Sequence, residues 1–193
     1  MRQTLSTERL ILRPWQAADR GDFAAICADP QAMAFLLPLP TADDSNAWID
    51  RQIAHQTAQG FCFWALEDKT TSEFIGTTGL VRIGYDAPFA PAVEIGWRIA
   101  RKFWGKGYAP EAARASLAFG FTRLKLDEIV AITVAANVKS RRVMSKLDMT
   151  HDTADDFDYP RVPAGHPLRS VMLYRLSRER WLRRQNSEPM DLT

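Results

Sequence analysis

The segment FWGKGYAPEA, residues 103–112, is the feature that most restricts how this chain can fold. An alternating apolar run, AVEIGWRIA (92–100), precedes it, and an alanine-rich run, EAARASLAFGF (111–121), follows it. The first run has the period of two of a β-strand, and the second has the spacing of an amphipathic helix. Two glycines permit a tight turn between them, and Pro110 is compatible with the first turn of a helix. The sequence therefore predicts a strand, a glycine turn and a helix in direct succession.

The next apolar run sets the fold class. EIVAITVAA (128–136) is apolar on both faces, as an interior strand is, so the chain holds a strand–helix–strand unit. We expect further strands at residues 8–15, 61–67, 73–83 and 170–177, and further helices at residues 22–29, 41–59 and 137–149. This pattern predicts an α/β (α+β) protein with one domain over residues 1–181 and a flexible tail over residues 182–193.

Several classes of protein do not fit the composition. No run approaches the roughly 20 apolar residues of a membrane span, and the N-terminus lacks the apolar core of a signal peptide. Cys27 and Cys62 have no metal-binding or redox spacing, and the three histidines form no metal set. We therefore expect a cytoplasmic protein without a metal, with both cysteines in the core. The sequence leaves open whether the protein is a monomer or a homodimer.

Positive charge is concentrated around the glycine turn. Residues 98–146 contain eleven Lys and Arg against three Asp and Glu, whereas the whole chain has a net charge of only +2. This local excess favours an anionic ligand. Nucleic acid is disfavoured, because no interleaved aromatic and basic pattern and no helix-turn-helix signal is present. A solvated basic face without a ligand fits the same charges.

Two interpretations of the glycine turn remain open. Glycines at 105 and 107 allow the backbone to approach a ligand closely, and the following helix N-terminus attracts an anion, with Lys106 adding a charge. A tight turn without any ligand fits the same residues. Neither named phosphate motif matches: the Walker spacing is absent, and Pro110 occupies the third glycine position of a dinucleotide fingerprint.

The run AVEIGWRIARKFWGKGYAPEA (92–112) resembles the acyl-coenzyme A signature Q/R-x-x-G-x-G/A of the GNAT superfamily of N-acetyltransferases. Trp104 stands in the Gln/Arg position, Gly107 in the glycine position and Ala109 in the last. The form W-G-K-G-Y-A resembles the branch that includes ribosomal-protein N-terminal acetyltransferases. The first strand, the closing strand and the helix at 137–149 resemble that branch as well, with Asp148 replacing its usual glycine.

The resemblance implies the GNAT fold, a mixed, strongly twisted sheet flanked by helices, whose central strands splay apart to admit the pantetheine arm. It implies acetyl-CoA as cosubstrate, with the pyrophosphate on the 104–109 turn. Backbone N–H groups of Ile99 and Ala100 would hold the acetyl carbonyl. The full set of implied binding residues is Ile99, Ala100, Trp104, Gly105, Lys106, Gly107, Tyr108, Ala109, Asn137 and Ser140.

The implied activity is acetyl transfer to a primary amine, and the acceptor stays open. A protein or peptide N-terminus, a small amine such as an antibiotic or polyamine, and a non-catalytic acyl-CoA sensor all fit. Met144 occupies the position where many superfamily members have a tyrosine acid, so Ser140 is the candidate that assists the leaving thiolate. A serine bonded to the Asn137 helix cap is the competing interpretation.

Glu94 is the candidate base, acting directly or through water. A structural ion pair with Arg98, on the same face of the strand, is the alternative. Gly96 lies between these two residues. A glycine there either forms a bulge or kink that helps the splay, or only relieves crowding.

Overall fold

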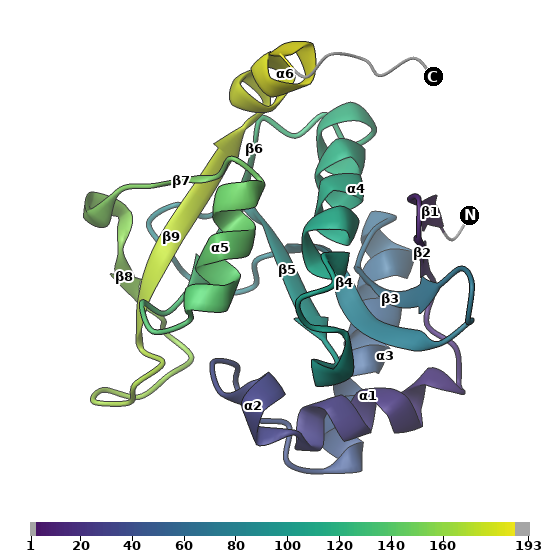
Figure 1. Ribbon diagram of the computed structural model, residues 1–193. Coiled ribbons are helices and arrows are strands. Elements are labelled where there is room, and N and C mark those ends of the chain that lie inside the picture. Colours follow the sequence, from purple (N-terminus) through teal and green to yellow (C-terminus); the bar gives the residue numbers. More distant parts are fainter. Residues whose placement is uncertain (1–2, 188–193) are drawn as a thin grey trace.

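The computed structural model describes residues 3–187 and contains a single open, mixed sheet (Figure 1). Antiparallel pairs dominate, and β5 and β6 form the parallel pair at its centre. The strands follow the order β1 (Leu5–Ser6), β2 (Leu10–Arg13), β3 (Phe63–Asp68), β4 (Phe74–Arg82), β5 (Val93–Ile99), β6 (Glu128–Thr133), β9 (Ser170–Ser177) and β7 (Thr150–His151), while β8 (Phe157–Asp158) also pairs with β9. The mixed α/β fold expected from the sequence is confirmed.

Helices cover both faces of the sheet (Figure 1). Along β3, Trp64 and Leu66 belong to one buried cluster and Ala65 to another, so the two clusters lie on opposite faces. The first cluster contains the apolar residues of α4 and α5, and the second contains those of α1 and α3. The helices are α1 (Asp19–Ala28), α2 (Pro30–Met33), α3 (Ala42–Gln59), α4 (Tyr108–Thr122), α5 (Val138–Lys146) and α6 (Arg178–Ser187), with 3₁₀ turns at Arg101–Phe103 and Thr153–Asp155.

Local sequence signals account for the ends of α3. The Thr41 side chain accepts a hydrogen bond from the Asp44 N–H, and the Asp44 carboxylate accepts one from the Thr41 N–H, which together form a capping box. Gly60 ends the helix with a left-handed φ of 82°. Both boundaries agree with the sequence prediction.

The central strands diverge, as the resemblance implied. β4 and β5 pair continuously from Gly76↔Ile99 to Arg82↔Val93, whereas β5 and β6 share the single pair Glu94↔Val130. Beyond Glu94 the two parallel strands separate. Because the β4–β5 register shows no shift at Gly96, this glycine makes no bulge. A Cβ there would stand 3.0 Å from the Phe63 ring, so Gly96 relieves crowding.

The C-terminal part of the chain differs from the prediction. Residues 178–187 form α6, so the first half of the expected tail is helical, and residues 188–193 lie outside the described residues. The Trp181 ring packs 5.3 Å from Phe121 of α4, which gives the helix an apolar anchor. Within residues 3–187, no helix is long and apolar enough to cross a membrane.

Candidate functional site

A cavity of about 840 Å³ opens where β5 and β6 separate. Its walls come from β5, the glycine turn, α5, and α2 with the loop that follows it. The residues that the sequence nominated for binding or catalysis line this cavity, with the exceptions of Ala100 and Lys106. The exposed Lys106 side chain lies with Nζ 5.3 Å from the centre of the Phe103 ring, outside the cavity.

The glycine turn presents a row of unused backbone donors. Gly105 and Gly107 have φ values of 78° and 83°, a conformation that strains any residue with a Cβ. In the part of the chain that the structure describes, the N–H groups of residues 105–109 have no hydrogen-bond partner. These donors precede and open α4, where the helix dipole is positive. Such a row of free N–H groups at a helix N-terminus can bind a phosphate-like anion.

Contacts from the N-terminal strand region hold this turn in place. The Glu111 carboxylate, in the first turn of α4, accepts hydrogen bonds from Thr7 Oγ1 at 2.5 Å and from the Arg9 N–H at 2.9 Å. Arg9 Nη1 donates to the Lys106 carbonyl at 2.9 Å. The carbonyl in the middle of the turn is therefore occupied by protein, while the N–H groups stay available.

Trp104 connects the turn to the end of β5. Its indole Nε1 donates to the Ile99 carbonyl at 2.8 Å, and Lys139 Nζ lies 3.8 Å from the centre of its ring. The tryptophan therefore links the turn to the end of β5 by a hydrogen bond, and Lys139 of α5 places a positive charge beside the turn.

The end of β5 corrects one prediction. The Ala100 N–H donates to the Ile75 carbonyl at 2.9 Å, so it belongs to the sheet and cannot hold an acetyl carbonyl. Hydrogen-bonded pairs alternate along an antiparallel ladder, so the N–H groups of Ile99 and Trp97 point away from β4, toward the gap beside β6. Ile99 stays a candidate donor, and Trp97 replaces Ala100 as the second.

Glu94 lies at the point where the splay begins. Burial raises the pKa of its carboxyl to about 7, although the hydrogen bond from Tyr85 and the charge of Arg161 act in the opposite direction. Tyr85 Oη donates to Glu94 Oε2 at a long 3.4 Å. The suggested ion pair with Arg98 is not present among the described residues, because Arg98 Nη1 instead donates to Cys27 Sγ at 3.2 Å. A carboxylate with a pKa near neutrality can accept a proton at physiological pH.

On α5, Asn137 caps the helix. Its Oδ1 accepts the Ser140 backbone N–H at 3.2 Å, as the sequence predicted. The cap bond involves the Ser140 backbone, and within the described residues its hydroxyl has no partner. That hydroxyl lines the cavity, one turn before the buried Met144. Ser140 therefore remains available for the role that the sequence suggested.

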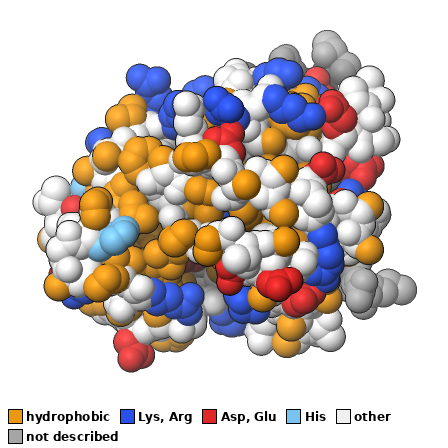
Figure 2. Space-filling model, turned by 90° about the horizontal axis from the view of Figure 1, so that it is seen from below, with side chains coloured by type: hydrophobic (Ala, Val, Ile, Leu, Met, Phe, Trp, Pro, Cys, Tyr) orange, Lys and Arg blue, Asp and Glu red, His pale blue; other side chains and the backbone are white. Residues whose placement is uncertain are grey.

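The opposite wall contains residues that sequence reasoning missed. Trp48 of α3, Phe63 of β3 and Arg98 of β5 line the cavity there. The Trp48 and Phe63 rings stack with centroids 6.0 Å apart. Phe35, beside α2, is 38% exposed at the cavity mouth, and Figure 2 shows hydrophobic side chains spread across this end of the molecule. The alternation of Glu94, Gly96 and Arg98 along β5 is the sequence pattern that could have placed Arg98 on this wall.

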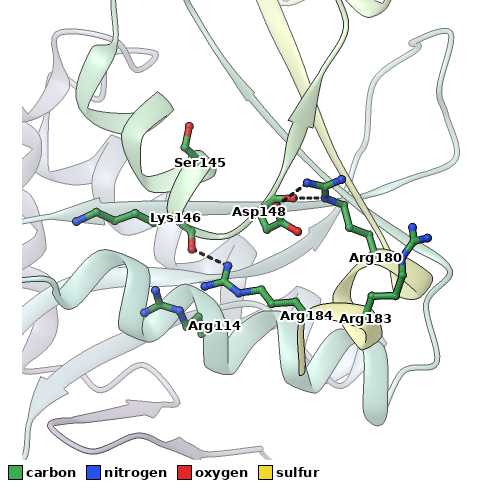
Figure 3. A pocket seen from close by; sticks show the side chains of 7 residues that line it. All are labelled: Arg114, Ser145, Lys146, Asp148, Arg180, Arg183 and Arg184. Carbon is green, nitrogen blue, oxygen red and sulfur yellow. Dashed lines mark hydrogen bonds and ion pairs between the residues drawn. The ribbon is translucent and has the colours of Figure 1, made fainter. Parts of the chain in front are cut away.

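A second hollow, of about 820 Å³, lies between α4, α5 and α6. Figure 3 shows its basic lining, in which Arg180 reaches Asp148 and Arg184 reaches the Lys146 carbonyl. The Arg180 Nη2–Asp148 Oδ1 distance is 2.6 Å. Asp148 has a φ of 62°, at the position where the resemblance expected glycine, and Arg180 holds it there. No group of three or more His, Cys, Asp or Glu among residues 3–187 is placed to hold a metal ion.

The comparisons with known proteins agree with this geometry. The model of the acetyltransferase (GNAT) domain matches residues 9–150. The uncharacterized N-acetyltransferase YnaD of Bacillus subtilis is 35% identical over 178 residues, which cover 92% of this chain and 98% of that protein. The FsC-acetyl coenzyme A-N(2)-transacetylase of Aspergillus fumigatus is 30% identical over 189 residues, 94% of this chain and 79% of that protein.

Among solved structures, a GNAT-family acetyltransferase from Bacillus anthracis superposes with a TM-score of 0.75 and 25% sequence identity, covering 92% of this chain and 99% of that one. The family match spans α2, β5, the glycine turn and α5, which are the elements that form the cavity. The chain therefore belongs to the GNAT acetyltransferase family, whose members take the acetyl group from acetyl-CoA.

Proposed function

We propose that this protein transfers an acetyl group from acetyl-CoA directly to a primary amine. The observation that carries the proposal is the row of unused N–H groups at residues 105–109 beside the gap between β5 and β6. The CoA pyrophosphate is the anion for this row, and the gap takes the pantetheine arm. The arm leads to the middle of β5, where the N–H groups of Ile99 and Trp97 polarise the acetyl carbonyl and stabilise the oxyanion.

Glu94 accepts the proton of the attacking amine, directly or through a water. Its pKa of about 7 allows it to be ionised at neutral pH and still basic enough to take that proton. The amine nitrogen attacks the thioester carbon, the carbon–sulfur bond breaks, and the CoA thiolate leaves. Ser140 donates a hydrogen bond to the developing sulfur charge, which Met144 cannot do.

The acceptor is a primary amine, and its class sets the finer function. The W-G-K-G-Y-A form of the turn supports a protein or peptide N-terminus, as in the ribosomal-protein acetyltransferase branch that it resembles. The Aspergillus fumigatus relative is named for transfer from acetyl coenzyme A to a nitrogen, which fits a small amine such as an antibiotic or polyamine as well as a peptide N-terminus. Cavity walls of Trp48, Phe63 and Phe35 fit an acceptor with apolar surface.

The experiment is an acceptor screen that measures the release of free CoA thiol from acetyl-CoA. N-terminal peptides, aminoglycosides and polyamines are supplied one at a time to the native protein and to the Glu94→Gln variant. We expect amine-dependent thiol release from the native protein, with mass spectrometry confirming the acetylated amine. Tight acetyl-CoA binding without amine-dependent release from any acceptor would instead make the protein a sensor of acyl-CoA.

A further inference from the structure

Arg98 is a half-buried cation that has no counter-charge among the described residues. Its guanidinium carries five N–H donors, and its one hydrogen bond within residues 3–187 is from Nη1 to Cys27 Sγ at 3.2 Å. Its Cζ atom lies 5.1 Å from the Phe23 ring centre and 5.3 Å from that of Trp48. Among the described residues, no Asp or Glu forms an ion pair with it. Charged groups that are removed from water are normally paired, so this arrangement needs an explanation.

Cys27 does not neutralise Arg98. Burial raises the pKa of the Cys27 thiol, and the charge of Arg98 opposes that shift without overcoming it. A thiol is also a weak hydrogen-bond acceptor. Burial correspondingly lowers the pKa of Arg98, the direction expected of a cation without a partner anion.

The unused part of the guanidinium faces the cavity. Arg98 lines the cavity together with Glu94, on the same face of β5. Among residues 3–187, the buried side-chain nitrogen without a partner is Nη2 of Arg178, so Nε and Nη2 of Arg98 are not sealed off from the cavity. Four residues of strand put the Cα atoms of Glu94 and Arg98 about 13 Å apart. Gly96, between them, has no side chain that would block that path.

We propose that Arg98 binds a carboxylate of the acceptor, so that the substrate is a small amine that also carries a carboxylate group. The planar guanidinium fork matches a carboxylate in geometry as well as in charge. The amine end lies toward Glu94 and the thioester, and the acidic end lies toward Arg98 and Trp48 at the cavity wall. This proposal rests on the proposed acetyl transfer and adds the acceptor's chemical class to it.

The test compares amines that differ only in the carboxylate. Butylamine is paired with 4-aminobutyrate, hexylamine with 6-aminohexanoate, and phenethylamine with phenylalanine, and the two ω-amino acids also measure the preferred spacing. We expect the native protein to favour the carboxylated member of at least one pair by about tenfold to 100-fold in kcat/KM. In Arg98→Met that preference should fall to about one, and Arg98→Lys should keep only part of it. Equal turnover of both members by the native protein would overturn the proposal.

Arg82→Met is the matched control, because Arg82 is on the neighbouring strand, is exposed and bonds to Gln59 Oε1 at 2.9 Å. It should keep the native preference. Melting temperature and acetyl-CoA affinity are measured for every variant. A loss of acetyl-CoA affinity in folded Arg98→Met would place Arg98 at the cofactor and contradict the proposal.

Failure of this proposal and failure of acetyl transfer give different results. If the native protein acetylates amines without preferring carboxylated ones, transfer stands and the role of Arg98 is wrong. If no amine is acetylated, calorimetric binding of the same pairs to the protein saturated with CoA still decides the matter. Tighter binding of the carboxylated members, abolished in Arg98→Met, would support the carboxylate site, and equal binding would exclude it.

Discussion

Two hollows among the described residues have nearly the same volume, about 840 Å³ and 820 Å³, but they differ in what their polar groups already bind. In the basic hollow between α4, α5 and α6, Arg180 pairs with Asp148, and Arg184 donates to the Lys146 carbonyl. In the cavity between β5 and β6, the N–H groups of residues 105–109 and most of the Arg98 guanidinium have no partner in the described residues.

The difference shows that charge and volume alone do not make a binding site. Cations that are already paired at a surface gain little free energy from binding a ligand, because the ligand must compete with their existing partners and with water. Unused donors in a partly closed cavity gain a hydrogen bond whenever a ligand arrives. Of the basic residues in the segment 98–146, Arg98, Lys139 and Arg142 line the cavity between β5 and β6, Arg114 lines the basic hollow, and Lys146 lines both.

The largest expected effect tests Glu94, the proposed base, which lies where β5 and β6 begin to separate. Glu94→Gln keeps the shape of the side chain but removes the proton acceptor, so kcat should fall by about 10²- to 10⁴-fold. Acetyl-CoA affinity, measured by calorimetry, should stay close to native. Glu179→Gln, on the surface of α6, serves as control. Native kcat in the variant would show that Glu94 is not the base.

The pH dependence tests the same residue. Since Glu94 has a pKa of about 7, native kcat/KM should rise with pH through that value as the carboxylate forms, and the acid limb should vanish in Glu94→Gln. Among the neighbours of Glu94, burial raises the pKa values of Tyr85 and Tyr159, so neither phenol titrates in this range. Because the folded protein holds this proton more tightly than the unfolded chain, the Glu94 contribution to the free energy of unfolding should decrease as pH rises from about 4.5 to 7. A flat native profile would contradict the assignment.

The next effect concerns the row of N–H groups. Gly107→Glu forces a side chain onto a backbone with φ of 83° and puts a negative charge at the proposed pyrophosphate site. Losing even two charge-assisted hydrogen bonds should weaken acetyl-CoA binding by about 100-fold or more. Gly165→Glu is the matched control, because Gly165 has φ of 80° and open space around it, away from the cavity. Equal affinity of Gly107→Glu and the native protein would refute the phosphate site.

A smaller effect is expected on the facing helix. Ser140→Ala should lower kcat by about tenfold to 100-fold with little change in acetyl-CoA affinity, because the hydrogen bond to sulfur strengthens only as the thiolate leaves. Its backbone bond to Asn137 Oδ1 survives the substitution, so the helix cap is kept. If acetyl-CoA affinity falls while kcat stays native, Ser140 is a binding residue and its catalytic role is wrong.

The smallest expected effect is on acetyl-CoA affinity and comes from a substitution in the basic hollow. Arg114→Met removes a cation from the basic hollow, and we expect acetyl-CoA affinity to change by less than about threefold at physiological salt, where surface charges are screened. Repeating the measurement at low and high salt separates a screened, long-range effect from a direct contact. A tenfold, salt-resistant loss would show that the basic hollow also binds the cofactor.

Much of the fold follows from residues close together in the sequence. The Thr41–Asp44 capping box and Gly60 delimit α3, and the glycines at 105 and 107 require the left-handed turn that opens α4. Caps, turns and the period of two depend on interactions within a few residues, so the sequence displays them directly. The sequence did not predict α6, because this helix depends on the packing of Trp181 against Phe121, a contact between distant residues.

By itself, the sequence determined the strand–turn–helix unit and the family, and most of the residues it nominated for the site do line the cavity, because these depend on local conformation and on short motifs. Only the tertiary structure decided how hydrogen bonds are distributed among distant partners. In the structure, the Ala100 N–H donates to the Ile75 carbonyl, and Arg98 donates to Cys27 instead of pairing with Glu94. Glu94 is left in buried surroundings that raise the pKa of its carboxyl. Burial and partner choice are set by which elements come together in space, and no short segment contains that information.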